Sequence, residues 1–321
     1  MAEVDDFSIP NEDYPSRLSR YQHLNEVVNS NLSYDGFAPH EALQSDARWL
    51  IRRTSSNGTL TTILWALSGL DKAIWSQRST YFPGTPGGKF STTSVQYNGT
   101  NSVSSGTTVF NNFERTDSFS ISFWLRLISL ANQQMFINDK ADSGTNTRGW
   151  AIRQFTAASG VLQFELVSSA ASALKLATTN PVLATNVWNH IVCTYNGTST
   201  VAGMLIYVNA VSQALTTVQN NLTTTIIPNI QFNVGAANNA SGVTNGYIDE
   251  VSVWNTVLTP TQITNIYNAG LPSDLTGFSN LVNWYRMGET DTWPVLNDSK
   301  SGQLLTMQNM SPSSFTNVTP P

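Results

Sequence analysis

Residues 119–127 read FSISFWLRL, and this stretch decides the fold class. An aromatic or aliphatic residue stands at every odd position, with Ser120, Ser122, Trp124 and Arg126 between them. A period of two is what a β-strand with one buried face requires. We therefore expect a half-buried strand whose odd positions point into a core and whose even positions point away from it.

Further strands are predicted beyond this stretch, in short runs bounded by Asn-Gly, Ser-Gly and Asn-Asn pairs. They lie at residues 149–154, 161–167, 188–195, 204–208, 230–235 and 246–254. One helix is predicted at 259–270, where Thr259 is the N-cap, Pro260 stands in the first turn and Gln262 completes a capping box. Many short strands with Gly and Asn turns indicate a mainly β fold, a sandwich or a barrel.

The charge content excludes several classes of protein. Of 321 residues only 12% are charged, while Ser, Thr and Asn together number 105, and the net charge is −5. A surface of this kind attracts no phosphate backbone, so nucleic-acid binding is not expected. The single Cys193 excludes an internal disulfide framework, and the longest apolar runs are too short for a membrane span.

The charges are unevenly distributed, and their distribution divides the chain. Residues 1–90 hold 18 charged side chains, whereas residues 176–248 hold none. The segment PGTPGG at 83–88 stands at the change and is typical of a linker. Before it we expect an amphipathic helix at 16–30 and a hairpin at 49–65 around Asn57-Gly58, together a small α+β region.

From 115 to 270 the order of motifs resembles the laminin-G-like, concanavalin A-like jelly roll. The motifs are FSISFW at 119–124, FINDK at 136–140, GWAI at 149–152, WNHIV at 188–192, LIYVN at 205–209 and GYIDEV at 246–251. The resemblance implies an antiparallel β-sandwich of two sheets, over residues 91–270. Lectins, adhesion modules and some glycan hydrolases use this scaffold, so the fold does not choose the function.

Residues 271–321 resemble the strand and turn that usually open such a domain. They contain LVNWYRMGE at 281–289 and LNDSKSG at 296–302. Either the segment returns to complete the sandwich or it begins a second, truncated module. Completion is favoured because so short a segment holds little apolar surface of its own. This tail and the N-terminal hairpin also resemble stretches in structural proteins of tailed bacteriophages.

Catalysis is not expected from the carboxylates. Retaining glycosidases need two carboxylates about 5 Å apart on one face. Glu165 stands alone in its strand, and Asp249 and Glu250 are adjacent, so we expect them on opposite faces. His190 has no Ser or Cys beside it in a triad pattern, and no nucleophile elbow or phosphate loop occurs. The chain is therefore predicted not to be an enzyme.

Binding sites are weakly marked. Trp150 and Trp124, at positions that could face solvent, are the candidates for stacking on a glycan, although either ring could instead be covered. Relatives of the fold bind calcium through rim loops, and here the resemblance would allow Asp139, Asp142 and Asn238 as ligands. Solvated turns account for these residues better than a calcium site does, since Asn and Asp favour turns, so we predict no cofactor and no firm metal site.

Three functional hypotheses follow. The first is a bacteriophage virion protein whose region 1–90 attaches to capsid or tail subunits and whose jelly roll is displayed on the particle as a decoration or fibre. The second is a tail appendage that binds a host-surface glycan, and the third is an enzyme. The uncharged run at 176–248 favours a homo-oligomer, because a neutral surface can lie against a copy of itself without burying unpaired charges.

Overall fold

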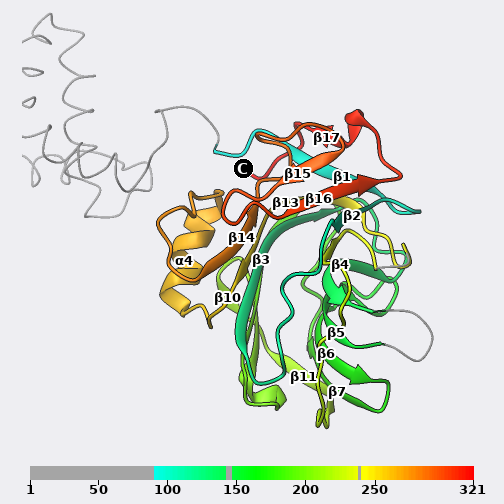
Figure 1. Cartoon of the computed structure of the whole chain (residues 1–321), viewed down its shortest axis with the longest axis vertical. Helices are drawn as coiled ribbons and strands as arrows, with labels where there is room; N and C mark the ends of the chain where they lie inside the picture. Colours follow the sequence, from blue (N-terminus) through cyan, green and yellow to red (C-terminus); the bar gives the residue numbers. More distant parts are fainter. Residues whose placement is uncertain (1–89, 142–146, 238–239) are drawn as a thin grey trace, which may run out of the picture. The chain divides into compact units, whose positions relative to one another are not determined.

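The computed structural model describes residues 90–141, 147–237 and 240–321. Two antiparallel sheets lie face to face in this part of the chain, with a short helix outside one of them (Figure 1). The predicted fold class, a mainly β sandwich of the jelly-roll type, is confirmed. The helix and hairpin predicted at 16–30 and 49–65, and the linker at 83–88, lie outside the described residues.

Sheet A has eight strands in the order β10-β9-β8-β3-β13-β1-β17, with β14 also paired to β13. Their bounds are β1 (Ser94–Asn98), β3 (Ser118–Leu127), β8 (Trp188–Asn196), β9 (Met204–Val208), β10 (Val211–Ser212), β13 (Asn245–Trp254), β14 (Leu281–Tyr285) and β17 (Phe315–Thr316). The first half of β13 pairs with β1 and the second half with β14, so β1 and β14 follow one another along β13.

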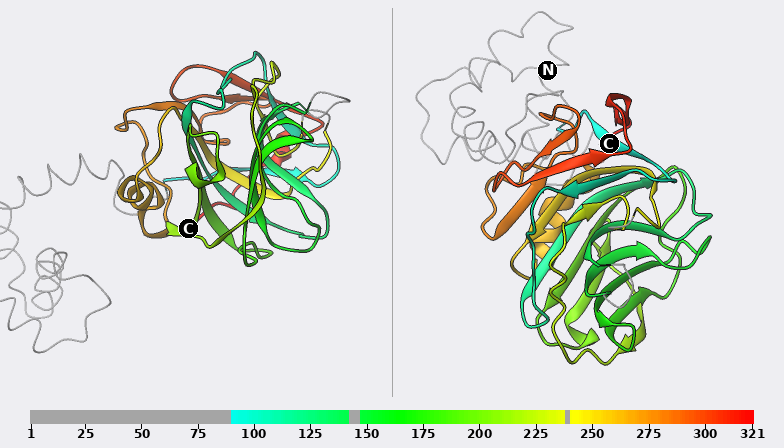
Figure 2. Two further views of the ribbon diagram at one scale, coloured as in Figure 1. Left: turned by 90° about the horizontal axis from the view of Figure 1, so that it is seen from below. Right: turned by 45° about the vertical axis from the view of Figure 1, so that its right-hand side comes forward.

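Sheet B has nine strands in the order β11-β7-β6-β5-β4-β12-β2-β16-β15. Their bounds are β2 (Val103–Gly106), β4 (Gln134–Lys140), β5 (Gly149–Gln154), β6 (Leu162–Ser169), β7 (Ser172–Thr178), β11 (Leu215–Asn220), β12 (Asn233–Val234), β15 (Val295–Asn297) and β16 (Leu304–Gln308). The two views of Figure 2 show this sheet stacked on sheet A as a second layer.

The main core lies between the sheets and is built from alternate positions of the long strands. In β3, the odd positions Phe119 to Leu127 are all buried in it, together with Tyr195 from β8 beside it and Trp150 and Phe164 from β5 and β6 of the facing sheet. Phe119 contacts each of these three rings at centroid distances of 5.7–6.1 Å. The period of two therefore predicts correctly which residues of β3 face the core.

The opposite face of β3 is also buried from Ser120 to Trp124, which corrects the expectation of a half-buried strand. The helix α4 (Pro260–Tyr267) covers it and forms a second apolar cluster with Trp254, Leu258 and Trp284. Tyr267 of this helix stacks at 5.9 Å on Trp124, whose exposed fraction is only 3%. The alternation of a single strand shows which side chains share a face, but it cannot show that a distant helix covers that face.

The C-terminal segment supplies strands to both sheets. β14 and β17 pair with sheet A, whereas β15 and β16 extend sheet B beside β2. Leu296, Leu305 and Met307 from this segment are buried in the main core. Among the described residues, no helix is both long and apolar enough to cross a membrane.

Candidate functional site

The outer face of sheet B, on the side away from the core, carries a row of charged side chains. Glu165 in β6 stands opposite Ala151 in β5 and Lys175 in β7, and Arg153 lies two pairs further along β5, on the same face. Glu165 is fully buried, and its two oxygens lie 2.7 Å from Arg153 Nη2 and 3.8 Å from Lys140 Nζ. A buried carboxylate needs such partners, because desolvation of an unpaired charge is costly.

Arg153 is held in one orientation by three groups. Besides the ion pair with Glu165, its Nε donates to Gln163 Oε1 at 3.3 Å. Its guanidinium also lies 4.4 Å from the ring centroid of Phe155, whose exposed fraction is 43%. A planar cation on an exposed aromatic ring presents fixed hydrogen-bond donors beside an apolar surface.

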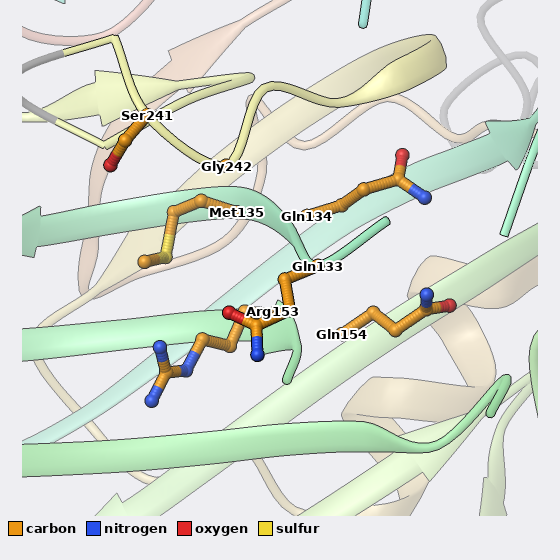
Figure 3. A pocket seen from close by; sticks show the side chains of 7 residues that line it. All are labelled: Gln133, Gln134, Met135, Arg153, Gln154, Ser241 and Gly242. Carbon is orange, nitrogen blue, oxygen red and sulfur yellow. The ribbon is translucent and has the colours of Figure 1, made fainter. Parts of the chain in front are cut away.

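A pocket of about 250 Å³ opens beside Arg153 at the edge between β4 and β5, and we call it the β4–β5 pocket. Its lining is Gln133, Gln134, Met135, Arg153, Gln154, Ser241 and Gly242. Figure 3 shows Met135 and Arg153 extending to one side and Gln134 and Gln154 to the other. A bulge in β4 between Met135 and Ile137 separates the strands locally, which opens this edge.

The glutamines fix the loop that precedes β4. Gln154 Nε2 donates to the carbonyl oxygens of Leu130 and Asn132 at 2.7 and 2.8 Å, and Gln134 Nε2 donates to Ser129 O at 2.7 Å. Gln154 Oε1 is buried, and among the described residues it accepts no hydrogen bond. The pocket thus combines a wall fixed by these hydrogen bonds with the donors of Arg153.

The two tryptophans named as glycan-binding candidates lie inside the molecule. Trp150 is fully buried in the main core, 5.7 Å from Phe119 and 6.0 Å from Phe232. Trp124 lies on the outer face of sheet A beneath Tyr267. A sugar cannot stack on either ring unless the side chains covering it move away. The exposed aromatic residue Phe155, next to Arg153, was not predicted from the sequence.

Of the three oxygen ligands considered for calcium, only Asp139 belongs to the described residues; Asp142 and Asn238 do not. Asp139 lies in β4 and is fully buried opposite Trp150 in β5. Burial raises the pKa of its carboxyl well above the usual range, which favours the neutral acid, a poor ligand for a hard cation. In the described part of the chain, no group of three or more His, Cys, Asp or Glu could hold a metal ion.

Asp249 and Glu250 reach the same polar cluster, which corrects the expectation that they lie on opposite faces. Glu250 has a φ of 48°, and the pairing of β13 with β3 shifts register between Asp249 and Ser252. This bulge interrupts the alternation of the strand, as bulges do. Asp249 accepts a hydrogen bond from Ser91 Oγ at 2.6 Å, and Glu250 accepts one from Trp284 Nε1 at 2.6 Å.

A serine also lies beside His190, although the sequence indicated none. Ser122 Oγ is 2.8 Å from His190 Nε2 across the β3–β8 pair, and both residues are buried. Burial lowers the pKa of His190 to about 3, so the imidazole is neutral. Tyr267 of α4 covers the ring at 5.8 Å. The Ser122–His190 pair and the carboxylates of Asp249 and Glu250 are all shielded from solvent. That the chain is not an enzyme stays a prediction.

Comparisons with known proteins agree with this architecture. The chain is similar to a Bacteroides ovatus protein for which carbohydrate binding is proposed, with 18% identity and a TM-score of 0.51 over 71% of this chain. The matched region spans only 61% of that protein. A heptameric SAP-like pentraxin from Limulus polyphemus shows 14% identity and a TM-score of 0.43, over 68% of this chain and 96% of the pentraxin.

A search of curated proteins gives no significant match. The family profile described as the concanavalin A-like lectin/glucanases superfamily, of laminin G type, matches residues 97–264, which is more than half of the chain and contains the strands from β2 to β13. The chain therefore belongs to the concanavalin A-like lectin/glucanases superfamily.

Proposed function

We propose that the jelly roll binds a carbohydrate on the outer face of sheet B, at the β4–β5 pocket. The observation that carries this proposal is the guanidinium of Arg153, held by Glu165 and placed over the exposed ring of Phe155. Saccharides present hydroxyl groups and apolar C–H faces, and a site for them combines aromatic rings with a few fixed polar groups. The fold shared with the Bacteroides protein gives further support.

The ion pair of Arg153 favours a neutral saccharide. Its guanidinium already has a carboxylate partner, Glu165 Oε2 at 2.7 Å, and so is not free to pair with an acidic group of a ligand. The donors of Arg153 that remain can bond to sugar hydroxyls, and Gln133 at the rim can both donate and accept. The ring of Phe155 supplies the apolar surface on which a sugar face would pack.

The test is a glycan array probed with the full chain, followed by Phe155→Ala. We expect binding to at least one neutral oligosaccharide, weakened about tenfold by the variant, since removing a stacking ring costs of the order of 1.4 kcal/mol. Trp293→Ala is the matched control, because Trp293 is 41% exposed, about as much as Phe155, but it is not the ring that lies against the guanidinium of Arg153. A protein that binds no glycan on a broad array would contradict the proposal.

We also propose that the protein is a bacteriophage virion component, with residues 1–90 attached to capsid or tail subunits and the jelly roll displayed on the particle. The change of charge density near residue 90 supports this division. So does the firm anchoring of the segment that enters the jelly roll. Arg286 Nη2 donates to Phe90 O at 2.6 Å, and Glu289 accepts from the backbone N–H groups of Thr92 and Thr93.

The virion proposal predicts that antibodies raised against the jelly roll label intact particles. Electron microscopy of particles labelled with gold-conjugated antibody would show whether the label lies on the capsid or on the tail. Mass spectrometry of washed particles would detect the chain independently. Particles that contain no copy of the chain would contradict the proposal, and the carbohydrate-binding proposal would be unaffected.

Finally, we propose that copies of the jelly roll associate through the uncharged stretch between residues 176 and 248. It includes β10 and β11, the edge strands of the two sheets, where Val211 and Val218 are more than half exposed. Unpaired edges with apolar side chains favour association. Thr217→Glu should therefore shift the sedimentation coefficient toward the monomer, whereas Thr261→Glu on α4 should not. An unchanged distribution of species in Thr217→Glu would contradict this.

A further inference from the structure

A second row of side chains, half-exposed, crosses the outer face of sheet A beside the row that α4 covers. Gln96 in β1 stands opposite Tyr247 in β13, Tyr247 opposite Arg126 in β3, and Arg126 opposite Trp188 in β8. We call these four residues the aromatic shelf. The next row along the same strands, which contains Trp124 and His190, is covered by Tyr267 of α4, whereas the shelf is half-exposed.

The shelf is organised around Arg126. Its guanidinium lies 5.3 Å from the ring centroid of Tyr247, and the rings of Tyr247 and Trp188 lie 6.4 Å apart. Within the part of the chain that the structure describes, Arg126 forms no ion pair with a carboxylate, in contrast to Arg153, which is paired with Glu165. A guanidinium without a carboxylate partner is suited to a bidentate contact with a carboxylate or sulfate group.

A polar pocket continues the shelf past β1, and we call it the serine pocket. Its volume is about 440 Å³, and its lining is Gln96, Asn98, Asn309, Met310, Ser311, Ser313 and Ser314. Gln96 belongs to both the shelf and the pocket. Because neighbouring strands are about 4.8 Å apart, Gln96 and Trp188 are separated by about 14 Å, the length of a short oligosaccharide. One strip thus offers aromatic rings, a cation, amides and hydroxyls.

We propose that the aromatic shelf and the serine pocket form a second saccharide site, which binds an acidic saccharide. Arg126 pairs with the carboxylate or sulfate of one sugar unit, Trp188 and Tyr247 pack against its apolar face, and the serine pocket bonds to the hydroxyls of the adjoining unit. Charge complementarity selects the acidic ligand, because the shelf holds one cation and no anion. The proposal stands independently of the neutral site on sheet B.

Calorimetric titration of the full chain with trigalacturonate at low salt tests this site. The carboxyl-reduced trisaccharide, identical except for its charge, is the matched ligand. We expect measurable binding of trigalacturonate, at least about tenfold weaker binding of the reduced form, and a loss of affinity with added salt. Equal affinity for the two trisaccharides, or binding of neither, would overturn the proposal.

Variants then locate the site. Arg126→Gln and Trp188→Ala should each weaken trigalacturonate binding at least about tenfold, and Arg126→Lys should fall between Arg126→Gln and the natural protein, since it keeps the charge but loses the fork. Phe155→Ala, which removes the ring of the sheet B site, should leave this affinity unchanged. The opposite pattern, loss with Phe155→Ala alone, would place the ligand on sheet B and overturn the proposal.

The variants also separate binding from a purely structural role. Cross-strand pairs such as Tyr247 with Arg126 contribute little to the stability of a sheet, so each variant should lower the melting temperature by only a few degrees. Circular dichroism confirms that the variant is folded before titration. Folded Arg126→Gln that binds trigalacturonate like the natural protein would show that the shelf is only a packing feature.

Discussion

Glu250, whose φ lies in the left-handed region, places a second buried carboxyl beside that of Asp249. Its φ of 48° turns its carboxylate toward the same cluster as Asp249, where Arg286 and Glu289 also lie. Burial is the largest effect and raises the pKa of Glu250 from its ordinary 4.5 to about 7, against the lowering effect of Arg286. Burial and the charge of Glu250 also raise the pKa of Asp249.

The raised pKa of Glu250 determines how the free energy of unfolding changes with pH. Between pH 4.5 and about 7, folded Glu250 holds a proton that the unfolded chain has released, so the free energy of unfolding falls as pH rises through this window. Glu250→Gln keeps an acceptor for Trp284 and removes the titrating group. Urea unfolding at pH 5 and pH 8 should show a smaller pH effect in the variant; an equal effect would contradict this assignment.

Gly149 is required by the backbone at the start of β5. Its φ is 127°, and a Cβ atom there would overlap the carbonyl oxygen of Asp139 in the paired strand. Gly149→Ala should therefore lower the free energy of unfolding by about 3 kcal/mol or more, as expected of a strained backbone with a main-chain clash. Gly302→Ala is the control, because Gly302 also has a positive φ of 78° but no atom lies within 4 Å. Thermal unfolding of both variants checks the difference.

The helix α4 joins the outer cluster to sheet A, and its capping box is formed as predicted. Gln262 N–H donates to Thr259 Oγ1 at 3.3 Å, and Thr259 N–H donates to Gln262 Oε1 at 2.9 Å. Thr259→Ala should cost about 1 kcal/mol and Ile263→Ala, which empties a fully buried position, about 2–4 kcal/mol. Exposed Thr261→Ala is the control. Similar urea midpoints for Ile263→Ala and Thr261→Ala would contradict the packing role.

The strands divide into those that the sequence predicts and those that depend on partners. Residues 149–154 and 204–208 form strands with the predicted bounds, since both runs are β-prone and end at turns. The predicted strand 230–235 shortens to Asn233–Val234, because Gly235 turns with a φ of 87° against the ring of Tyr97. β7 and β11 were not predicted. Their Ala, Lys, Gln and Asn residues have little β-propensity, and cross-strand pairing stabilises them instead, of β7 with β6 and of β11 with β7.

The candidate sites were harder to predict than the fold, for a physical reason. Period-two patterns assign Trp124 and Arg126 to one face of β3, but the first is covered by α4 and the second is not. Burial on that face depends on where α4 packs against sheet A, and no local pattern encodes this. The pairing of Arg153 with Glu165 could have been predicted from the sequence, because both lie on outward positions of predicted neighbouring strands. The bulge at Glu250 gave no signal in the sequence.

The tail makes the jelly roll depend on contacts between distant parts of the chain. Val95 pairs with Phe315, and Ser105 pairs with Thr306, so both sheets contain strands from the first and last segments described. Contacts of such long sequence separation form late and slow folding. Because the tail pairs with strands of both sheets, neither sheet is complete without it. We therefore expect residues 90–321 to unfold in a single cooperative transition.

A substitution in the tail should consequently destabilise the whole sandwich. Leu305 in β16 is fully buried in the main core, and Leu305→Ala should lower the free energy of unfolding by about 2–5 kcal/mol. Near-UV circular dichroism and tryptophan fluorescence, which includes buried Trp150 in β5, should report the same lowered urea midpoint. Gln308→Ala, exposed at the end of the same strand, should change neither signal. If the two signals gave different urea midpoints in Leu305→Ala, the tail would be a subdomain added to an independently stable sandwich.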